Sequence, residues 1–227
     1  MATKAHVVAA DLDRDRLDAL VTEIERDGHA ASAVTVDVTD SQQVRNMMAW
    51  IAANVGDVDA LFNNAGITVR SPVETIRPED WDRVVATHVK GTYLCCKAVL
   101  PGMCERRKGV IVNMASDFAV RGMPGASAYA AAKTAVYSLT KSLAVEFAPF
   151  DIRVNALGPG PIDTPILRVG RTAAEYGEVV EGFKKRIPMG RLGRPDEVAA
   201  VLDFLLSERS SYITGQLIHP NGGQLQW

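Results

Sequence analysis

"HVVAADLDRDRL" (residues 6–17) joins a short apolar, β-branched stretch to an acidic residue and to the first turns of an amphipathic helix. Asp11 ends the expected strand, at the position where a nucleotide-binding sheet places a carboxylate for a ribose. That carboxylate normally follows a glycine-rich turn by about 20 residues, whereas only ten residues precede Asp11. The stretch therefore predicts a strand followed by a helix, and it raises the question of whether an earlier strand is missing.

The rest of the chain continues the alternation of strands and helices. Apolar, strand-like segments cover residues 31–36, 58–62, 109–115, 152–158 and 216–220. Helical periodicity separates them, with the longest helix expected from about Pro78 to Arg107. Apolar strands that alternate with helices predict a parallel sheet covered on both faces. No linker, repeat or low-complexity tract divides the chain, so residues 1–227 are expected to form one α/β domain.

The composition argues against several classes of function. The net charge is −2 over 227 residues, which gives no reason to expect a nucleic acid or an anionic membrane as a partner. No apolar run approaches the ~20 residues of a membrane span, and the first residues do not resemble a secretory signal. Cys95, Cys96 and Cys104 lack the spacing of a metal site or a disulfide framework. We therefore expect no bound metal and a reducing, cytoplasmic environment.

Polar and glycine-containing residues follow four of the predicted strands. Asp37 and Val38 follow the strand at 31–36, and "NNAG" (63–66) follows the next one. Ser116 comes directly after the strand at 109–115, and "PGPIDTP" (159–165) follows the strand at 152–158. Ligands of such sheets bind at the carboxyl ends of the strands. These residues are therefore expected to share one ligand-binding edge.

"YAAAK" (129–133) is the most informative stretch for chemistry. Tyr129 and Lys133 are four residues apart, so on a helix they lie on the same face. A tyrosine, with an unperturbed pKa of about 10, becomes a usable acid or base when a nearby ammonium stabilises its phenolate. An isolated pair of this kind is more often a surface feature. Ser116, thirteen residues upstream at a strand end, adds a hydroxyl that can bind a substrate oxygen.

Ser116, Tyr129 and Lys133 at this spacing, with "NNAG" before them and "PGPIDT" after them, resemble the short-chain dehydrogenase/reductase family. The resemblance covers nearly the whole chain. It implies a doubly wound, mainly parallel, Rossmann-like sheet and hydride transfer between a nicotinamide dinucleotide and an alcohol or carbonyl substrate. It also implies that Tyr129 is the acid/base, that Ser116 orients the substrate oxygen, and that Lys133 holds the nicotinamide ribose and lowers the tyrosine pKa.

The same resemblance implies a set of cofactor-binding residues. Besides Tyr129 and Lys133, these are Asp11, Leu12, Asp37, Val38, Asn64, Ala65, Gly66, Pro159, Gly160, Ile162 and Thr164. The residues of "NNAG" would support the adenosine side, and those from 159 to 164 would surround the nicotinamide and the pyrophosphate. Asp11 should accept hydrogen bonds from the ribose and repel a 2′-phosphate, and Leu12 adds no positive charge. Arg14 and Arg16 are expected on the following helix, solvated or paired with acids. We therefore expect NAD to be preferred over NADP.

His88 is a departure from the family pattern. The family usually has an asparagine in a "VNLKGT"-like stretch, where it relays protons through water to the lysine. This chain reads "ATHVKGTYL" there, which places His88 at the relay position and makes it a fourth candidate catalytic residue. A histidine can bridge a water through one ring nitrogen. The alternative is a packed helix residue without a relay role, and the sequence leaves both open.

The second departure concerns the start of the fold. The first strand of the family and its TGxxxGxG turn, which binds the pyrophosphate at a helix N-terminus, are expected before "HVVAADLD" and are not present. That strand would lie between the strands at 6–11 and 58–62. Met1 is then an internal methionine of a longer product, the start of a truncated gene model or the start of a true shortened variant. Because the turn is missing, a non-catalytic fragment unable to bind the dinucleotide is the alternative to an active oxidoreductase.

Two further expectations concern assembly and substrate. The helices that contain "GTYLCCKAVLPGM" and "YAAAKTAVYSLTKSLAVEF" are apolar on more than one face. Family members use these helices in their subunit interfaces, so the resemblance implies a homodimer or homotetramer. The substrate pocket is expected to include Phe118, Met123 and parts of the segment from Ile166 to Met189. The residue types there do not identify the substrate.

Overall fold

The computed structural model describes residues 5–168 and 172–226. The main elements, in chain order, are β1 (His6–Asp11), α1 (Arg14–Arg26), β2 (Ala30–Thr35), α2 (Ser41–Asn54), β3 (Ala60–Asn63), α3 (Pro78–Val85), α4 (Gly91–Arg106), β4 (Gly109–Met114), α5 (Ser127–Phe147), β5 (Ile152–Leu157), α6 (Ala173–Lys184), α7 (Pro195–Leu206) and β6 (Leu217–Ile218). Each strand expected from the sequence is present within a residue or two, and the α/β class is confirmed.

The described strands pair in parallel but form two sheets. β1 pairs with β2, with His6 opposite Ala30. The second sheet has the order β3-β4-β5-β6, with Ala60 of β3 opposite Val110 of β4. β1 and β3 each have one strand partner among the described residues. The expectation that a strand belongs between them is therefore compatible with the pairing, although the pairing alone does not show such a strand.

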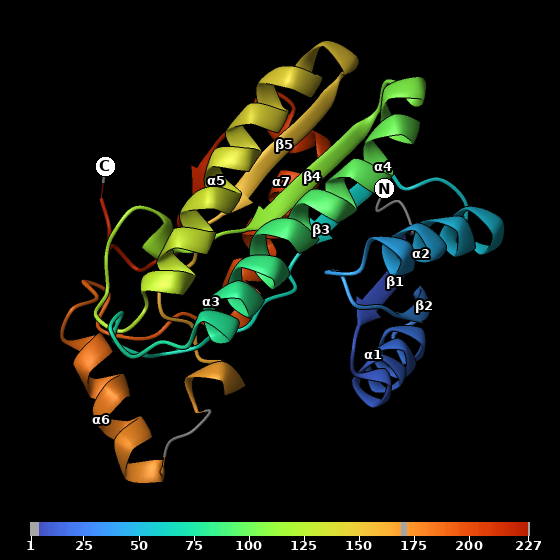
Figure 1. Ribbon diagram of the computed structural model, residues 1–227. Helices are drawn as coiled ribbons and strands as arrows, with labels where there is room; N and C mark the ends of the chain where they lie inside the picture. The colour runs from blue at the N-terminus through green and yellow to red at the C-terminus, as the bar shows by residue number, and fades with distance from the viewer. Residues whose placement is uncertain (1–4, 169–171, 227) are drawn as a thin grey trace.

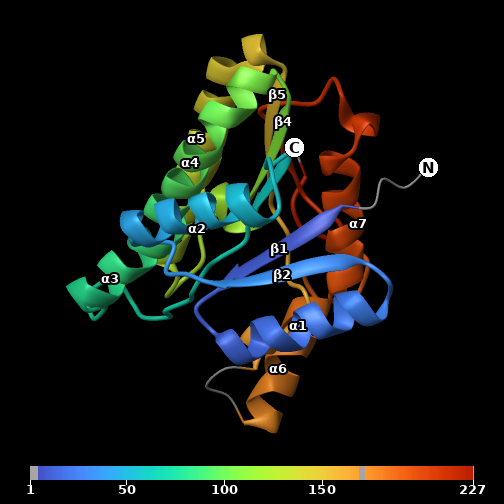
Figure 2. The ribbon, with the colours of Figure 1, turned by 90° about the vertical axis from the view of Figure 1, so that its right-hand side faces the viewer.

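Helices cover both faces of the larger sheet. In Figures 1 and 2, α4 and α5 lie on one face of β4 and β5, and α7 lies on the other face. β4 is buried along nearly its whole length, and Ile111 and Val112 are fully buried on its two sides. Ile111 packs with α4 and α5, whereas Val112 packs with α7. A strand that is apolar on both faces is what a doubly wound sheet requires.

The smaller sheet is joined to the larger one by helix α2. Val44, Met47 and Ile51 form the buried stripe of α2, as their spacing predicted. They share one apolar cluster with Val34 of β2 and Leu61 of β3. Figure 2 shows β1 and β2 between α1 and α2, beside the larger sheet. Side-chain packing through α2 therefore holds the two sheets together.

The long helix expected from Pro78 to Arg107 is present, but it contains one wide turn. Residues Ala86–Lys90 form a π-helical turn between α3 and α4. Such turns insert an extra residue into a helix and are frequent at functional sites. Here the turn contains His88, whose side chain is buried at 2% exposure. The helix ends where Arg107 adopts a left-handed conformation.

No helix in the described part of the chain is long and apolar enough to cross a membrane.

Candidate functional site

The candidate catalytic residues come from two neighbouring elements. Ser116 lies two residues beyond the end of β4 and caps a short 3-10 turn, where its Oγ accepts a hydrogen bond from the backbone N of Phe118 at 3.2 Å. Tyr129 and Lys133 lie one turn apart near the start of α5. One cavity of about 190 Å³ is lined by Ser116 and Tyr129. The structure thus brings the predicted hydroxyl and phenol together.

The hydroxyl of Ser116 is hydrogen-bonded to the residue that follows it. Its Oγ donates to Oδ1 of Asp117 at 3.1 Å. Asp117 is buried at 2% exposure, and its other oxygen, Oδ2, accepts from Arg121. Asp117 and Arg121 both line the cavity. The sequence interpretation missed them, although their spacing of four residues is typical of an ion pair within one turn.

The pKa of Tyr129 differs from the sequence-based expectation. Burial raises this pKa to about 12, and the hydrogen bond with Ser116 and the charge of Arg70 only partly oppose the rise. The net shift is therefore upward, and the lowering by Lys133 that the family resemblance implies stays a prediction. The physical reason for the rise is that desolvation of the phenolate outweighs the nearby charges. The Tyr129 hydroxyl is therefore protonated at neutral pH.

Lys133 is buried more deeply than a typical lysine. Its Nζ donates to the backbone oxygen of Met114, at the end of β4, and lies 5.5 Å from the centre of the Tyr129 ring. Burial lowers the pKa of Lys133 to about 7. Burial therefore favours the neutral amine over the ammonium.

His88 lies against the predicted "NNAG" loop and against the tyrosine. Its Nε2 lies 2.7 Å from the backbone oxygen of Ile67, and its ring is 5.3 Å from that of Tyr129 in an edge-to-face arrangement. Burial, and then the charge of Lys133, lowers the pKa of His88 to about 4, so the ring is neutral. The backbone N of Ile67 lies 3.2 Å from the same nitrogen, and we assign the ring proton to Nε2 because the carbonyl is closer. Nδ1 is then an acceptor, and it is buried without a partner among the described residues.

Gly66 makes the position of His88 possible. A Cβ at residue 66 would lie 2.4 Å from Cε1 of His88. The glycine of "NNAG" therefore allows the loop after β3 to approach the π-helical turn closely.

The residues expected around the nicotinamide lie in the same cavity. Pro159, Gly160, Ile162 and Thr164 all line it, together with Ser116 and Tyr129. Gly160 fits closely against Asn221, since a Cβ at Gly160 would lie 2.9 Å from that side chain. The segment thus shares one cavity with the candidate catalytic hydroxyls, and its role in cofactor binding stays a prediction.

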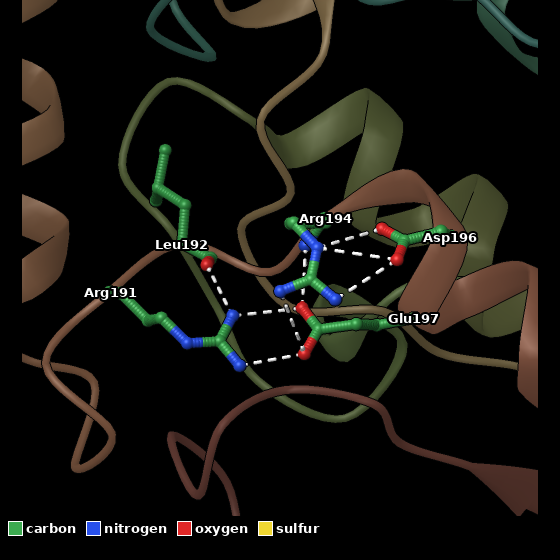
Figure 3. Close-up of polar contacts among 5 residues, drawn as sticks. All are labelled: Arg191, Leu192, Arg194, Asp196 and Glu197. Carbon is green, nitrogen blue, oxygen red and sulfur yellow. Dashed lines mark hydrogen bonds and ion pairs between the residues drawn. The ribbon is translucent and has the colours of Figure 1, made fainter.

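A network of ion pairs holds the loop that contacts the 159–164 segment. Ile162 forms a parallel bridge with Gly193, and the backbone N of Asp163 donates to the oxygen of Gly193 at 2.9 Å. Figure 3 shows how the loop that contains Gly193 is held: Arg191 binds both carboxylate oxygens of Glu197 on α7. These contacts lower the pKa of Glu197 to about 2. Gly193 and Glu197 therefore fix the position of the 159–164 segment.

The residues expected around the adenosine lie apart from this cavity. All lie at the carboxyl ends of strands: Asp11 ends β1 and Leu12 follows it, Asp37 and Val38 follow β2, and Asn64, Ala65 and Gly66 follow β3. Among the described lining residues of the cavity, none of the seven appears. The carboxylate of Asp37 is hydrogen-bonded within its own loop, because its Oδ1 accepts from the backbone N and the hydroxyl of Thr39.

The surroundings of Asp11 agree with the charge pattern expected from the sequence. Oδ1 of Asp11 accepts from the backbone N of Asp13 at 3.0 Å, and Leu12 is 68% exposed. Arg14 is paired with Asp18 on α1, and Arg16 is paired with Asp13, each within 3 Å. The two arginines are therefore held by acids of their own helix and its cap.

The pocket wall agrees only in part with the sequence interpretation. Phe118 lines the cavity, as do Leu167 and Phe183 from the expected carboxyl-terminal segment. Met123 is not among the lining residues. Residues 169–171 of that segment lie outside the described residues. Thr68 and Arg70, from the loop after "NNAG", line the cavity and were missed because no periodicity marks a loop residue as part of a pocket.

Comparison with known proteins finds relatives that match nearly the whole chain. The sequence model of one family, described as enoyl-(acyl carrier protein) reductase, matches residues 1–224. The 3-oxoacyl-(acyl-carrier-protein) reductase of Thermotoga maritima is 40% identical over 219 residues, which are 96% of this chain and 87% of that protein.

Two solved structures share the fold. The gluconate 5-dehydrogenase of Burkholderia cenocepacia, in complex with NADP and tartrate, has a TM-score of 0.89 at 32% identity and covers 96% of this chain and 84% of its own. A putative gluconate dehydrogenase of Agrobacterium tumefaciens has a TM-score of 0.93 at 31% identity and covers 98% of this chain and 87% of its own. The chain belongs to the short-chain dehydrogenase/reductase family of oxidoreductases, which transfer a hydride between a nicotinamide dinucleotide and an alcohol or carbonyl carbon.

Proposed function

We propose that this protein reduces a small carbonyl compound, and oxidises the corresponding alcohol, with Tyr129 as the acid/base. The observation that carries the proposal is the single cavity that Ser116, Tyr129 and the 159–164 segment line together. A bound nicotinamide supplies or accepts the hydride, and the protein supplies position and electrostatics. The segment fits this role, because its residues line the cavity and Gly160 lets it pack closely against Asn221.

The protonation states of Tyr129 and Lys133 favour carbonyl reduction at neutral pH. Tyr129 retains its proton there because its pKa is about 12. It can therefore give this proton to the carbonyl oxygen as the carbon is reduced, while Ser116 donates a hydrogen bond to the same oxygen after leaving Asp117. Lys133, with a pKa of about 7, exchanges protons readily in this pH range and can reload the tyrosine.

His88 extends this proton path. Its unpartnered Nδ1 is a buried acceptor, and buried polar atoms without a partner in the protein commonly bind an ordered water. We assign it the water relay to Lys133, whose charge already acts on the histidine. The alternative is a histidine that only packs between Ile67 and Tyr129. His88→Phe distinguishes the two roles, because loss of a relay shifts the pH profile of kcat, whereas loss of packing lowers thermal stability.

The preferred cofactor is proposed to be NAD. The support is the carboxylate of Asp11 at the end of β1, with Arg14 and Arg16 paired to acids rather than turned to a phosphate. The gluconate 5-dehydrogenase neighbour was solved with NADP, so NADP is the competing assignment. The ratio of kcat/KM for the two cofactors decides between them, and Asp11→Ser should move it toward NADP. Equal or better use of NADP by the unchanged protein would refute the NAD assignment.

The pyrophosphate site is proposed to lie between β1 and β3. Each of these strands has one partner among the described residues, so a parallel strand between them would complete one continuous sheet. A glycine-rich turn after that strand would bind the pyrophosphate through backbone N–H groups.

Assembly and location complete the proposal. We propose a homodimer or homotetramer that pairs through α4 and α5, on which Tyr93 and Val145 are exposed at 45% and 79%. A cytoplasmic location agrees with three cysteines that are free thiols. Neither a nucleic acid nor a membrane is proposed as a partner.

The direct test is hydride transfer with a panel of ketones and alcohols, followed as nicotinamide absorbance. Tyr129→Phe removes the group that exchanges the substrate proton, so activity should fall by ~10²–10⁴-fold. Retention of most of the rate in this variant would contradict the mechanism. A chain that binds neither dinucleotide by calorimetry would support the non-catalytic alternative instead.

A further inference from the structure

Asp117 is a buried carboxylate in the cavity wall to which the proposed chemistry gives no role of its own. Its side chain is 3% exposed, and it lines the cavity together with Ser116 and Tyr129. Its Oδ1 accepts from Oγ of Ser116 at 3.1 Å. Its Oδ2 accepts from Nε of Arg121 at 2.8 Å and also from Nη2. Both carboxylate oxygens therefore have a donor.

Arg121 fixes the orientation of this carboxylate. The guanidinium that donates twice to Oδ2 also stacks on Phe118, with Cζ 4.5 Å from the ring centre. The arginine side chain is 27% exposed, whereas the carboxylate that it holds is buried. A carboxylate that is paired with a guanidinium can only accept hydrogen bonds. Asp117 thus presents an acceptor, and never a donor, to Ser116.

The direction of the hydrogen bonds at Ser116 follows from this pairing. A serine hydroxyl has one proton to donate and two lone pairs that accept. Asp117 takes the proton, and the backbone N of Phe118 donates to one lone pair at 3.2 Å. Ser116 is also hydrogen-bonded with Tyr129, and toward this phenol it can then only accept. The protons therefore point one way, from the phenol to the serine and from the serine to the carboxylate.

This direction affects the ionisation of the phenol. A phenolate is stabilised by hydrogen-bond donors, and Ser116 can donate to it only by turning its proton away from Asp117. The charge of the carboxylate acts in the same sense, because it raises the pKa of Tyr129. Both effects keep the proton on the phenol, which is the form that can protonate a carbonyl oxygen.

Other charged or titratable groups also face Tyr129. The charge of Arg70, from the loop after β3, lowers the pKa of the phenol. On the same helix, Nζ of Lys133 lies 5.5 Å from the ring centre. The ring of His88, from the π-helical turn, lies 5.3 Å away, and Arg121 lines the same cavity. These groups stay in place when the carboxylate is replaced, so they do not account for a change that the replacement produces.

We propose that Asp117 is a positioning residue that directs the Ser116 proton away from Tyr129 and so keeps the phenol in its acid form. Arg121 contributes by fixing the carboxylate. The inference rests on the proposed function, in which this phenol is the acid/base. In the reduction, the nicotinamide gives a hydride to the carbonyl carbon and the phenol gives its proton to the oxygen. Asp117 therefore favours reduction over oxidation at neutral pH, because oxidation requires the phenolate.

Asp117→Asn tests the inference by reversing the hydrogen bond at the serine. The amide oxygen accepts from Arg121, so the amide N–H group faces Ser116 and donates to it. The serine proton is then free to stabilise the phenolate. A hydrogen bond to a charged group changes a pKa by ~1–2, so the pH at which Tyr129 is half ionised should fall by at least ~1 pH unit. Phenolate absorbance after a rapid rise in pH measures it, and Tyr129→Phe is the reference that subtracts the other tyrosines.

The same substitution in a Ser116→Ala background separates positioning from charge. Without the serine hydroxyl, Asp117→Asn removes only a negative charge, so the fall in the half-ionisation pH should be smaller than in the parent by ~1 pH unit or more. Asp151→Asn is the matched control, because Asp151 forms an ion pair with Arg107 in which both side chains are exposed. This control should leave the titration of Tyr129 unchanged.

A second readout is the pH profile of kcat/KM for alcohol oxidation, which Asp117→Asn should move to lower pH by the same amount. Circular dichroism checks that the variants fold, and Asp117→Ala, which also removes the acceptor, replaces the asparagine variant if that one does not. An unchanged titration, or an equal fall with and without the serine hydroxyl, overturns the inference. The expected titrations without hydride transfer by the parent protein would support the inference and refute the proposed function.

Discussion

The contact between Gly66 and His88 allows a stability prediction that does not depend on activity. The perturbation is Gly66→Ala, which places a Cβ 2.4 Å from Cε1 of His88, about 1 Å closer than the 3.4 Å at which ordinary contacts begin. The histidine has little room to move. It is 2% exposed, Ile67 holds its Nε2, and the ring of Tyr129 lies 5.3 Å away.

Overpacking of this kind costs ~1–3 kcal/mol. For a domain of this size, each kcal/mol corresponds to about 2–4 °C in Tm, so Gly66→Ala should lower Tm by about 2–12 °C. The penalty should disappear when His88→Ala is introduced first, because the alanine at residue 66 then occupies vacated space. The difference between the two backgrounds should therefore be ~1–3 kcal/mol.

The assay is urea unfolding of the parent, both single variants and the double variant. Gly122→Ala is the matched control, because a Cβ there meets nothing within 4 Å, and its effect should stay within ~0.5 kcal/mol. If Gly66→Ala costs the same with and without the imidazole, the proposed contact between the loop and the π-helical turn is wrong.

Three other predictions concern pH, the sheet and assembly. The pKa of Lys133 is about 7 in the folded state against its ordinary value of 10.5. Between these values the unfolded state binds more protons, so the free energy of unfolding should rise with pH. Lys133→Met should flatten this rise in urea unfolding. Addition of ~20–30 residues that encode a strand, a glycine-rich turn and most of a helix before residue 1 should raise Tm and introduce further stabilisation by dinucleotide; cooperative melting of the 227-residue chain above about 60 °C with micromolar NAD binding would refute this. Light scattering at micromolar concentration should give the mass of a dimer or tetramer, and a strictly monomeric mass would contradict the interface through α4 and α5.

Much of the fold could be predicted from the sequence because its determinants are local. Apolar strands with helical periodicity between them set the order of the elements, and Asp13 and Asp40 cap α1 and α2 through their own side chains. The spacing of Tyr129 and Lys133 placed them on one helix face. Their position relative to Ser116 followed from the rule that parallel strands present their carboxyl ends on one edge.

The protonation states were decided only by the tertiary structure. Desolvation depends on the atoms that surround a group from distant parts of the chain, and it raises the pKa of Tyr129 while it lowers those of Lys133 and His88. The sequence shows only that a lysine is near the tyrosine. It does not show how deeply both are buried, so the rise in the tyrosine pKa could not be predicted from it.

The sequence by itself determined the order of strands and helices, and it singled out Ser116, Tyr129, Lys133 and Asp11 as candidate site residues. Only the tertiary structure decided that Arg70 and Arg121 line the same cavity, that Asp117 links the serine to a guanidinium, and that Gly66 fits against His88. The physical reason is the separation along the chain over which each interaction acts. Periodicity and capping act within one or two turns of chain, whereas these contacts depend on how loops from separate strands converge at one edge of the sheet.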